Sequence, residues 1–280
     1  MLPLLDVRGL TVDLPTPGGW IRPVENVSFH LDKGETLGIV GESGSGKTML
    51  ALALMGLLPR GARASGEGFL LPRGPHDDAN ANLRVNLLAA APSEMRAIRG
   101  REIAMIFQEP LSAMNPVMRA GVQIEEAIRA HEPRLSALEV RERALEAMRH
   151  AAIPEPEIRA RQYPHQLSGG LRQRAMIAMA LAAGSRVLIA DEPTTALDAT
   201  IQKQILKLLA RLRDELRLAI IFITHDLGVA SEIADRLSVM HAGRFVEEGA
   251  TRDVLTRPRN SYTERLLRAA PRLDRGVAAS

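Results

Sequence analysis

The sequence predicts an α/β fold with a largely parallel sheet, and three observations support this prediction. Short apolar runs such as Thr36–Val40 and Ala219–Thr224 are typical of strands that are buried on both faces. Helical patterns alternate with these runs, which favours a parallel sheet covered by helices. The chain has 280 residues, of which 46% are hydrophobic, so it can bury a substantial core.

The elements follow one another in a regular order. The predicted strands are Leu4–Leu14, Val24–Leu31, Thr36–Val40, Ile103–Phe107, Val187–Ala190 and Ala219–Thr224, with a hairpin of Leu237–Met240 and Arg244–Glu247 around Gly243. Prolines and glycines between residues 15 and 19 predict a turn that contains Trp20 at its end. Helical patterns cover about 49–57, 121–161 and 172–183, and an apolar stripe of Ile201, Ile205, Leu208, Leu209, Leu212 and Leu216 predicts a further amphipathic helix.

These patterns also predict the domain organisation. Residues 1–108 and 166–250 form an α/β core with an N-terminal β subdomain, 109–165 form an inserted helical subdomain, and 251–280 form a tail with helical pieces. Residues 72–96 are rich in Pro, Ala and Asn and have weak periodicity, so we interpret them as an insertion or mobile loop.

Composition excludes several classes of function. The 36 basic and 33 acidic residues leave a net charge of only +3, without a long basic run, so no nucleic-acid partner is expected. The chain has no cysteine, which excludes disulfides and cysteine-bound metals. The longest apolar run, Met49–Leu58, has ten residues, whereas a membrane span needs roughly 20. Any membrane role is therefore expected to come through a partner.

The segment Gly41-Glu42-Ser43-Gly44-Ser45-Gly46-Lys47-Thr48 fits the phosphate-loop pattern GxxxxGK[ST]. A buried strand precedes the segment and a helix follows it, which is the context that this motif requires. Its glycines allow backbone N–H groups to point at phosphate oxygens, and the positive end of the helix dipole adds to the attraction. Lys47 is expected to reach the β- and γ-phosphates, and the Thr48 hydroxyl to bind Mg2+.

A second group of chemical residues ends the buried strand Val187–Ala190. Asp191 and Glu192 follow this strand at the edge of the sheet where the phosphate loop also opens. We expect Asp191 to hold Mg2+, directly or through water, and Glu192 to polarise the attacking water. An acidic pair that caps a helix would be the ordinary alternative for these residues in isolation.

The third element is Leu167-Ser168-Gly169-Gly170-Leu171-Arg172-Gln173. Ser168, Gly169 and Gly170 offer a hydroxyl and exposed amides at a helix start, a second arrangement that binds phosphate. The motif is weak alone, and its position about twenty residues before the Asp191-Glu192 strand makes it a strong signal.

With these three elements in this order, the chain resembles the nucleotide-binding subunits of ABC transporters over about residues 4–270. Gly41–Thr48 matches the Walker A loop, the strand ending at Asp191 matches Walker B, Glu192 the catalytic glutamate, and Leu167–Gln173 the signature motif. The resemblance implies a P-loop NTPase cassette of the ABC type, with ATP and Mg2+ bound and ATP hydrolysed.

The resemblance also assigns residues that are uninformative alone. Gln108 in AMIFQEP matches the Q-loop, which implies contact with Mg2+ or water; in isolation it would more simply cap a strand. His225 in FITHDLGV matches the switch histidine, which implies a γ-phosphate contact. Ala196-Leu197-Asp198 matches the D-loop, which implies that Asp198 contacts a facing subunit, although a helix N-cap is the plain alternative. Trp20 is our candidate for stacking on adenine, with a surface tryptophan nearly as good an interpretation.

The stretches YPHQLSGGLRQRAMIAMALA and NSYTERLLRAAPRLD are similar to those of di- and oligopeptide importer ATPases, which include nickel-type importers. This similarity implies a peripheral subunit on the cytoplasmic face of the inner membrane, with two permease subunits as partners and, indirectly, a solute-binding protein. It implies a head-to-tail dimer with an identical or homologous ATPase, in which the signature motif of each chain faces the ATP of the other. The solute is not specified.

Two other functions are alternatives at this point. A soluble ABC ATPase of translation or DNA repair typically carries two cassettes, coiled coils or zinc motifs, none of which the sequence displays. A regulatory protein that binds ATP without hydrolysing it is disfavoured because Glu192 and His225 are both present.

Overall fold

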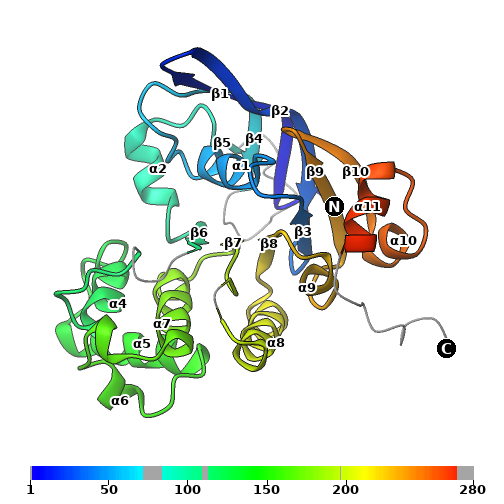
Figure 1. The fold of residues 1–280 in the computed structure, drawn as a ribbon. Coiled ribbons are helices and arrows are strands. Elements are labelled where there is room, and N and C mark those ends of the chain that lie inside the picture. Colours follow the sequence, from blue (N-terminus) through cyan, green and yellow to red (C-terminus); the bar gives the residue numbers. More distant parts are fainter. Residues whose placement is uncertain (1, 72–83, 109–112, 196, 270–280) are drawn as a thin grey trace. The chain divides into compact units, whose positions relative to one another are not determined.

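The computed structural model describes residues 2–71, 84–108, 113–195 and 197–269. By contacts, the chain divides into two compact units, residues 1–90 with 221–280 and residues 91–220 (Figure 1). Each unit is described separately below. None of the helices in the described ranges is both long and apolar enough to cross a membrane.

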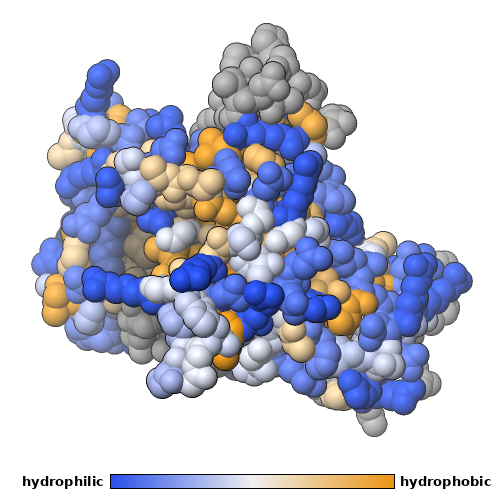
Figure 2. Space-filling model, turned by 90° about the horizontal axis from the view of Figure 1, so that it is seen from above, coloured by the Kyte–Doolittle hydropathy of each residue, from blue (hydrophilic) through white to orange (hydrophobic). Residues whose placement is uncertain are grey.

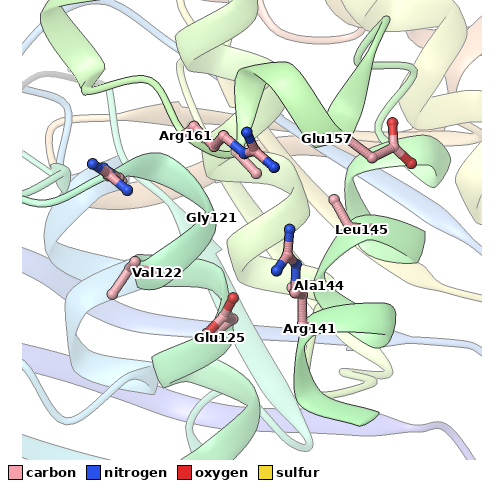
Figure 3. Close-up of a pocket in the computed structure, with 10 residues that line it drawn as sticks. Gly121, Val122, Glu125, Arg141, Ala144, Leu145, Glu157 and Arg161 are labelled. Carbon is pink, nitrogen blue, oxygen red and sulfur yellow. The ribbon is translucent and has the colours of Figure 1, made fainter. Parts of the chain in front are cut away.

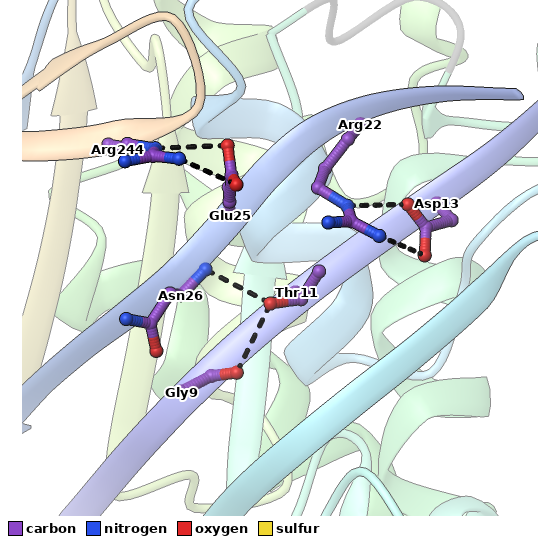
Figure 4. Close-up of polar contacts among 7 residues, drawn as sticks. All are labelled: Gly9, Thr11, Asp13, Arg22, Glu25, Asn26 and Arg244. Carbon is purple, nitrogen blue, oxygen red and sulfur yellow. Dashed lines mark hydrogen bonds and ion pairs between the residues drawn. The ribbon is translucent and has the colours of Figure 1, made fainter.

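The first unit contains the N-terminal antiparallel sheet, in the strand order β2-β1-β4-β5. Its strands are β1 (Leu5–Thr16), β2 (Gly19–Leu31), β4 (Arg63–Leu70) and β5 (Val85–Asn86). Two charged pairs, Arg22 with Asp13 and Arg244 with Glu25, bridge the exposed side of this region (Figure 4). Each Arg lowers the pKa of its partner carboxyl, chiefly through the hydrogen bond that it donates.

The same unit contains strands in the order β10-β9-β3-β8, with β3 parallel to β9 and β10 antiparallel to β9. These strands are β3 (Thr36–Val40), β8 (Ala219–Thr224), β9 (Arg236–His241) and β10 (Arg244–Ala250). The helices of this unit are α1 (Lys47–Leu54), α9 (Leu227–Ser231), α10 (Thr251–Thr256) and α11 (Ser261–Ala269). Ala242 and Gly243 both have positive φ, which suits the tight β9–β10 turn.

The second unit pairs the parallel strands β6 (Ile103–Ile106) and β7 (Val187–Asp191). Its helices are α2 (Pro92–Ile98), α4 (Ala120–Arg129), α5 (Ala137–His150), α6 (Pro156–Arg159), α7 (Gly169–Leu181) and α8 (Ala199–Leu216), with a short 3-10 helix, η2 (Pro164–Gln166). Helices α4, α5 and α7 pack against one another, and Ile124, Val140 and Ala175 are buried among them.

Most predicted elements are present, with some corrections. For 72–96, the mobile-loop alternative is wrong in the described part because residues 85–86 form β5 and α2 begins at Pro92; residues 72–83 lie outside the described ranges. Pro92 occupies the first turn of α2, and the Glu94 carboxylate accepts a hydrogen bond from the Ala91 amide at 2.8 Å. Both features favour the start of a helix at this position. The apolar Met95 and Ile98 are buried.

Trp20 also differs from its predicted position. It lies in β2 opposite Pro15 in β1, one residue after the strand begins, rather than in the turn. Trp20 is 52% exposed, and the guanidinium of Arg63 lies 4.5 Å from the centroid of its ring. The cation–π contact gives this tryptophan a partner within its own sheet.

On the face that Figure 2 displays, hydrophobic residues form small groups among hydrophilic ones. Within the second unit, a cavity of about 220 Å³ opens between α4, α5 and α6 (Figure 3). Its lining includes the guanidinium groups of Arg119, Arg141 and Arg161 beside Glu125 and Glu157. Since Glu157 also pairs with Arg149 at 2.6 Å, the cavity is positively charged on balance.

Candidate nucleotide site

The first unit holds the phosphate loop between β3 and α1. The loop follows the fully buried strand β3, and Lys47 and Thr48 are the first residues of α1. Gly46 caps this helix with φ of 108°, a conformation that L-residues rarely adopt. The first turn of α1 therefore starts directly at the loop, and the N-terminus of a helix favours a bound phosphate.

Neighbouring strands hold the loop so closely that two of its glycines have no room for a side chain. A Cβ on Gly41 would lie 2.1 Å from the carbonyl oxygen of Met240, and a Cβ on Gly46 would lie 2.0 Å from that of Pro23. The Gly243 amide also donates to the Ser45 carbonyl at 3.0 Å. Residues of β2 and β9 thus fix the path of the loop.

The Lys47 side chain folds back and hydrogen-bonds to residues of the phosphate loop itself. Its Nζ donates to the carbonyl oxygens of Gly41 at 2.7 Å and Glu42 at 2.8 Å, and to the Ser45 hydroxyl at 3.3 Å. Lys47 and Ser45 are each 5% exposed, while Ser43, Gly44 and Thr48 are exposed. The loop therefore presents exposed backbone and hydroxyl groups above a buried ammonium, an arrangement that attracts phosphate.

His225 belongs to the same unit, directly after β8. Its side chain is exposed. The next residue, Asp226, accepts hydrogen bonds from the amides of Gly228 and Val229 and so caps α9. The strand and the cap together fix the backbone that carries His225.

The second unit brings Gln108 and Glu192 together. Gln108 Nε2 donates to the Glu192 carboxylate at 3.1 Å, and the Thr195 hydroxyl donates to the same oxygen at 2.8 Å. Glu192 has φ of 47°, a left-handed backbone that is uncommon outside glycine. Glu192 therefore has an unusual backbone conformation, and two hydrogen-bond donors hold its carboxylate.

Thr195 is a residue that sequence reasoning missed. It lies three positions after Glu192, and its amide donates to the Glu192 carbonyl at 3.2 Å, so the chain turns at this point. A hydroxyl at the fourth position of a turn can reach the first side chain, and this spacing was the available signal.

The signature residues stand at the start of α7. Ser168 is the N-cap, and its hydroxyl accepts from the Leu171 amide at 3.4 Å. Ser168 and Gly169 are exposed at this helix start. A Cβ on Gly170 would lie 2.9 Å from Ile201 of α8, which explains a glycine at that position.

Asp198 adopts the plainer of its two predicted roles in this chain. Its carboxylate accepts from the amides of Thr200 and Ile201, each at 3.0 Å, and so caps α8. Ala196, the first residue of the predicted D-loop, lies outside the described residues.

The residues proposed for Mg2+ have suitable chemistry. Thr48, Gln108 and Asp191 supply a hydroxyl, a carboxamide and a carboxylate, all oxygen donors of the kind that Mg2+ prefers. Asp191 is 3% exposed at the end of β7. The described residues contain no group of three or more His, Cys, Asp or Glu side chains that could hold a metal ion.

A phosphate loop between a buried strand and a helix defines a P-loop nucleotide-binding protein. The profile of the ABC transporter family matches residues 24–195. The chain belongs to the ABC transporter family, and within it to the ATPases.

Relatives match over almost the entire chain. A putative peptide import ATP-binding protein of Brucella abortus is 48% identical and covers 97% of this chain and 78% of its own length. The oligopeptide transport ATP-binding protein OppD of Bacillus subtilis is 46% identical, covering 97% of this chain and 73% of its own. The dipeptide transport ATP-binding protein DppD of Lactococcus lactis is also 46% identical, covering 98% and 75%.

Solved structures confirm the predicted fold class. A dimeric post-hydrolysis structure of the ATP-binding cassette MJ0796 bound to ADP and Pi aligns with a TM-score of 0.75 at 28% identity, covering 89% of this chain and 99% of the other. The protein cbiO1 of Clostridium perfringens, described as part of an ABC transporter complex, aligns with a TM-score of 0.70 at 25% identity, covering 91% of each chain.

Proposed function

We propose that this chain is the ATP-hydrolysing motor subunit of an importer for dipeptides, oligopeptides or a related small solute. The observation that carries the proposal is the phosphate loop, where Lys47 and the first turn of α1 form a positively charged cradle. The names of the relatives support the solute class. They do not support the alternative of a soluble ABC ATPase in translation or DNA repair.

The proposed reaction is attack of water on the γ-phosphorus of ATP. Glu192 accepts the proton from the attacking water, the bond from the γ-phosphorus to the β–γ bridging oxygen breaks, and ADP and phosphate are formed. The bonds from Gln108 and Thr195 hold the Glu192 carboxylate in one orientation. His225 contacts the γ-phosphate in this proposal, and bound Mg2+ supplies charge neutralisation at the phosphates.

The proposed assembly pairs two ATPase subunits head to tail. The start of α7 at Ser168, Gly169 and Gly170, where the first two residues are exposed, would bind the ATP held by the phosphate loop of the facing subunit, which is an identical chain or a homologue. The dimeric ABC cassettes among the structural neighbours support this assembly. We propose that Asp198 lies at the same seam, in addition to capping α8.

The remaining partners are two permease subunits and, indirectly, a solute-binding protein. We propose that the helical subdomain 109–165 contacts the permeases. The surface of this subdomain includes the arginine-lined cavity between α4, α5 and α6 (Figure 3). This assembly would place the chain peripherally on the cytoplasmic face of the inner membrane.

Replacement of Lys47 by alanine tests the proposed site. The change removes the ammonium without adding volume, and we expect ATP binding to fall at least tenfold because charge-assisted bonds to phosphate are lost. Equilibrium binding of a fluorescent ATP analogue measures the effect. Binding by Lys47→Ala equal to that of the wild type would overturn the assignment of the loop.

A further inference from the structure

The hydroxyl group of Tyr262 links the C-terminal helix α11 to the phosphate loop. The Glu42 amide donates a hydrogen bond to the Tyr262 hydroxyl at 3.2 Å. The Glu42 carbonyl, in turn, accepts from Lys47 Nζ at 2.8 Å. Both backbone groups of Glu42 are thus engaged, one by the C-terminal helix and one by the phosphate-binding lysine.

The tyrosine is firmly placed. Its side chain is 4% exposed, and its ring centroid lies 3.9 Å from that of His241, the last residue of β9. It belongs to a hydrophobic cluster with Val40, the residue that precedes the loop, and with Val254 of α10. Burial raises the pKa of the Tyr262 phenol, so the hydroxyl stays neutral near pH 7 and can accept the Glu42 N–H.

The start of α11 is itself tied to the sheet. The Glu247 carboxylate of β10 accepts from the amides of Arg259 at 2.7 Å and Asn260 at 3.1 Å. Asn260 Oδ1 accepts from the Tyr262 amide at 2.9 Å. These bonds restrict movement of Tyr262. Its hydrogen bond with the Glu42 amide therefore restrains the phosphate loop.

We infer that Tyr262 is a positioning residue for nucleotide binding: through the Glu42 peptide it sets the path of the phosphate loop and the place of Lys47. The C-terminal helix is thereby part of the nucleotide site. This inference rests on the proposed function, since it concerns the same phosphate loop.

Replacement of Tyr262 by phenylalanine isolates the hydroxyl, because the ring keeps its contacts with His241 and the cluster. The lost hydrogen bond is expected to raise the Kd for ATP about three- to tenfold. The midpoint of thermal unfolding should change little, and kcat at saturating ATP should stay near that of the wild type while KM rises.

Tyr163 offers a matched control, because it is the other tyrosine of the chain and belongs to the other unit. Tyr163→Phe removes the same hydroxyl group and should leave the Kd for ATP unchanged. An unchanged Kd in Tyr262→Phe, with the wild type binding ATP and Lys47→Ala failing to bind it, would overturn the role of Tyr262 and leave the proposed function intact. A wild type that does not bind ATP would overturn both.

Discussion

At the scale of single residues, the nucleotide site needs glycines because neighbouring backbone leaves no room for a side chain, and not only because glycine is flexible. Gly41 and Gly46 lie against the carbonyl oxygens of Met240 and Pro23. The sequence predicted their role as a phosphate cradle, since motif and context agree. It could not predict that β2 and β9 pack against these glycines, because the contacting residues of both strands are distant from the glycines in sequence.

Replacement of Gly46 by alanine tests this close packing. The new Cβ would lie 2.0 Å from the Pro23 carbonyl oxygen at φ of 108°, so we expect a loss of about 2–4 kcal/mol in stability from overpacking and strain. ATP binding should fall with it. Gly44→Ala is the control, since Gly44 also has positive φ but has no atom within 4 Å of the point where a Cβ would stand; it should cost only about 1–2 kcal/mol. Equal stability of the two variants in thermal unfolding would contradict this account.

The orientation of Glu192 is also a residue-scale feature. The strand pattern predicted Glu192 and the family resemblance predicted Gln108, and in the structure Gln108 Nε2 lies 3.1 Å from the Glu192 carboxylate. Thr195 was missed because a threonine is common in turns and carries no chemical signature by itself. The left-handed backbone at Glu192 is likewise a feature that sequence patterns do not reveal.

At the scale of elements, buried strands were easiest to predict. The observed bounds of β3 and β8 equal the predicted ones because both strands are buried throughout and mostly apolar. β4 was missed since its sequence, RASGEGFL, has little apolar alternation and two glycines. In α8 the predicted stripe holds in its middle, but Leu216 is 44% exposed at the helix end and Leu206 is buried instead. Ends of helices depend on neighbours that the sequence pattern does not specify.

The cap of α8 gives an element-scale prediction. Asp198→Ala removes the acceptor for two amides, and we expect a loss of about 1 kcal/mol in stability. Asp198→Asn retains an acceptor oxygen and should be nearly as stable as the wild type. Denaturant unfolding compares the two variants. If Asp198 also serves the subunit seam through its charge, Asp198→Asn lowers ATPase activity at unchanged stability. Wild-type stability in Asp198→Ala would refute the cap.

At the scale of the whole molecule, each of the two units contains some of the candidate residues. The phosphate loop and His225 belong to one, and Gln108, Asp191, Glu192 and the signature residues belong to the other. Periodicity and motif order predicted the α/β class and these groups of residues. The division into two units could not be predicted from the sequence, because it follows from contacts between elements that are far apart in the chain.

We propose that this chain hydrolyses ATP with Glu192 as the base, in a dimer that ATP holds together. Phosphate release and oligomeric mass, measured for Glu192→Gln and the wild type co-expressed with their partner subunits, test it most directly. Glutamine keeps the shape of the side chain but cannot accept the proton, so we predict retained ATP binding, an accumulated ATP-bound dimer and phosphate release reduced about 10²-fold or more. Wild-type phosphate release by Glu192→Gln would contradict the claim.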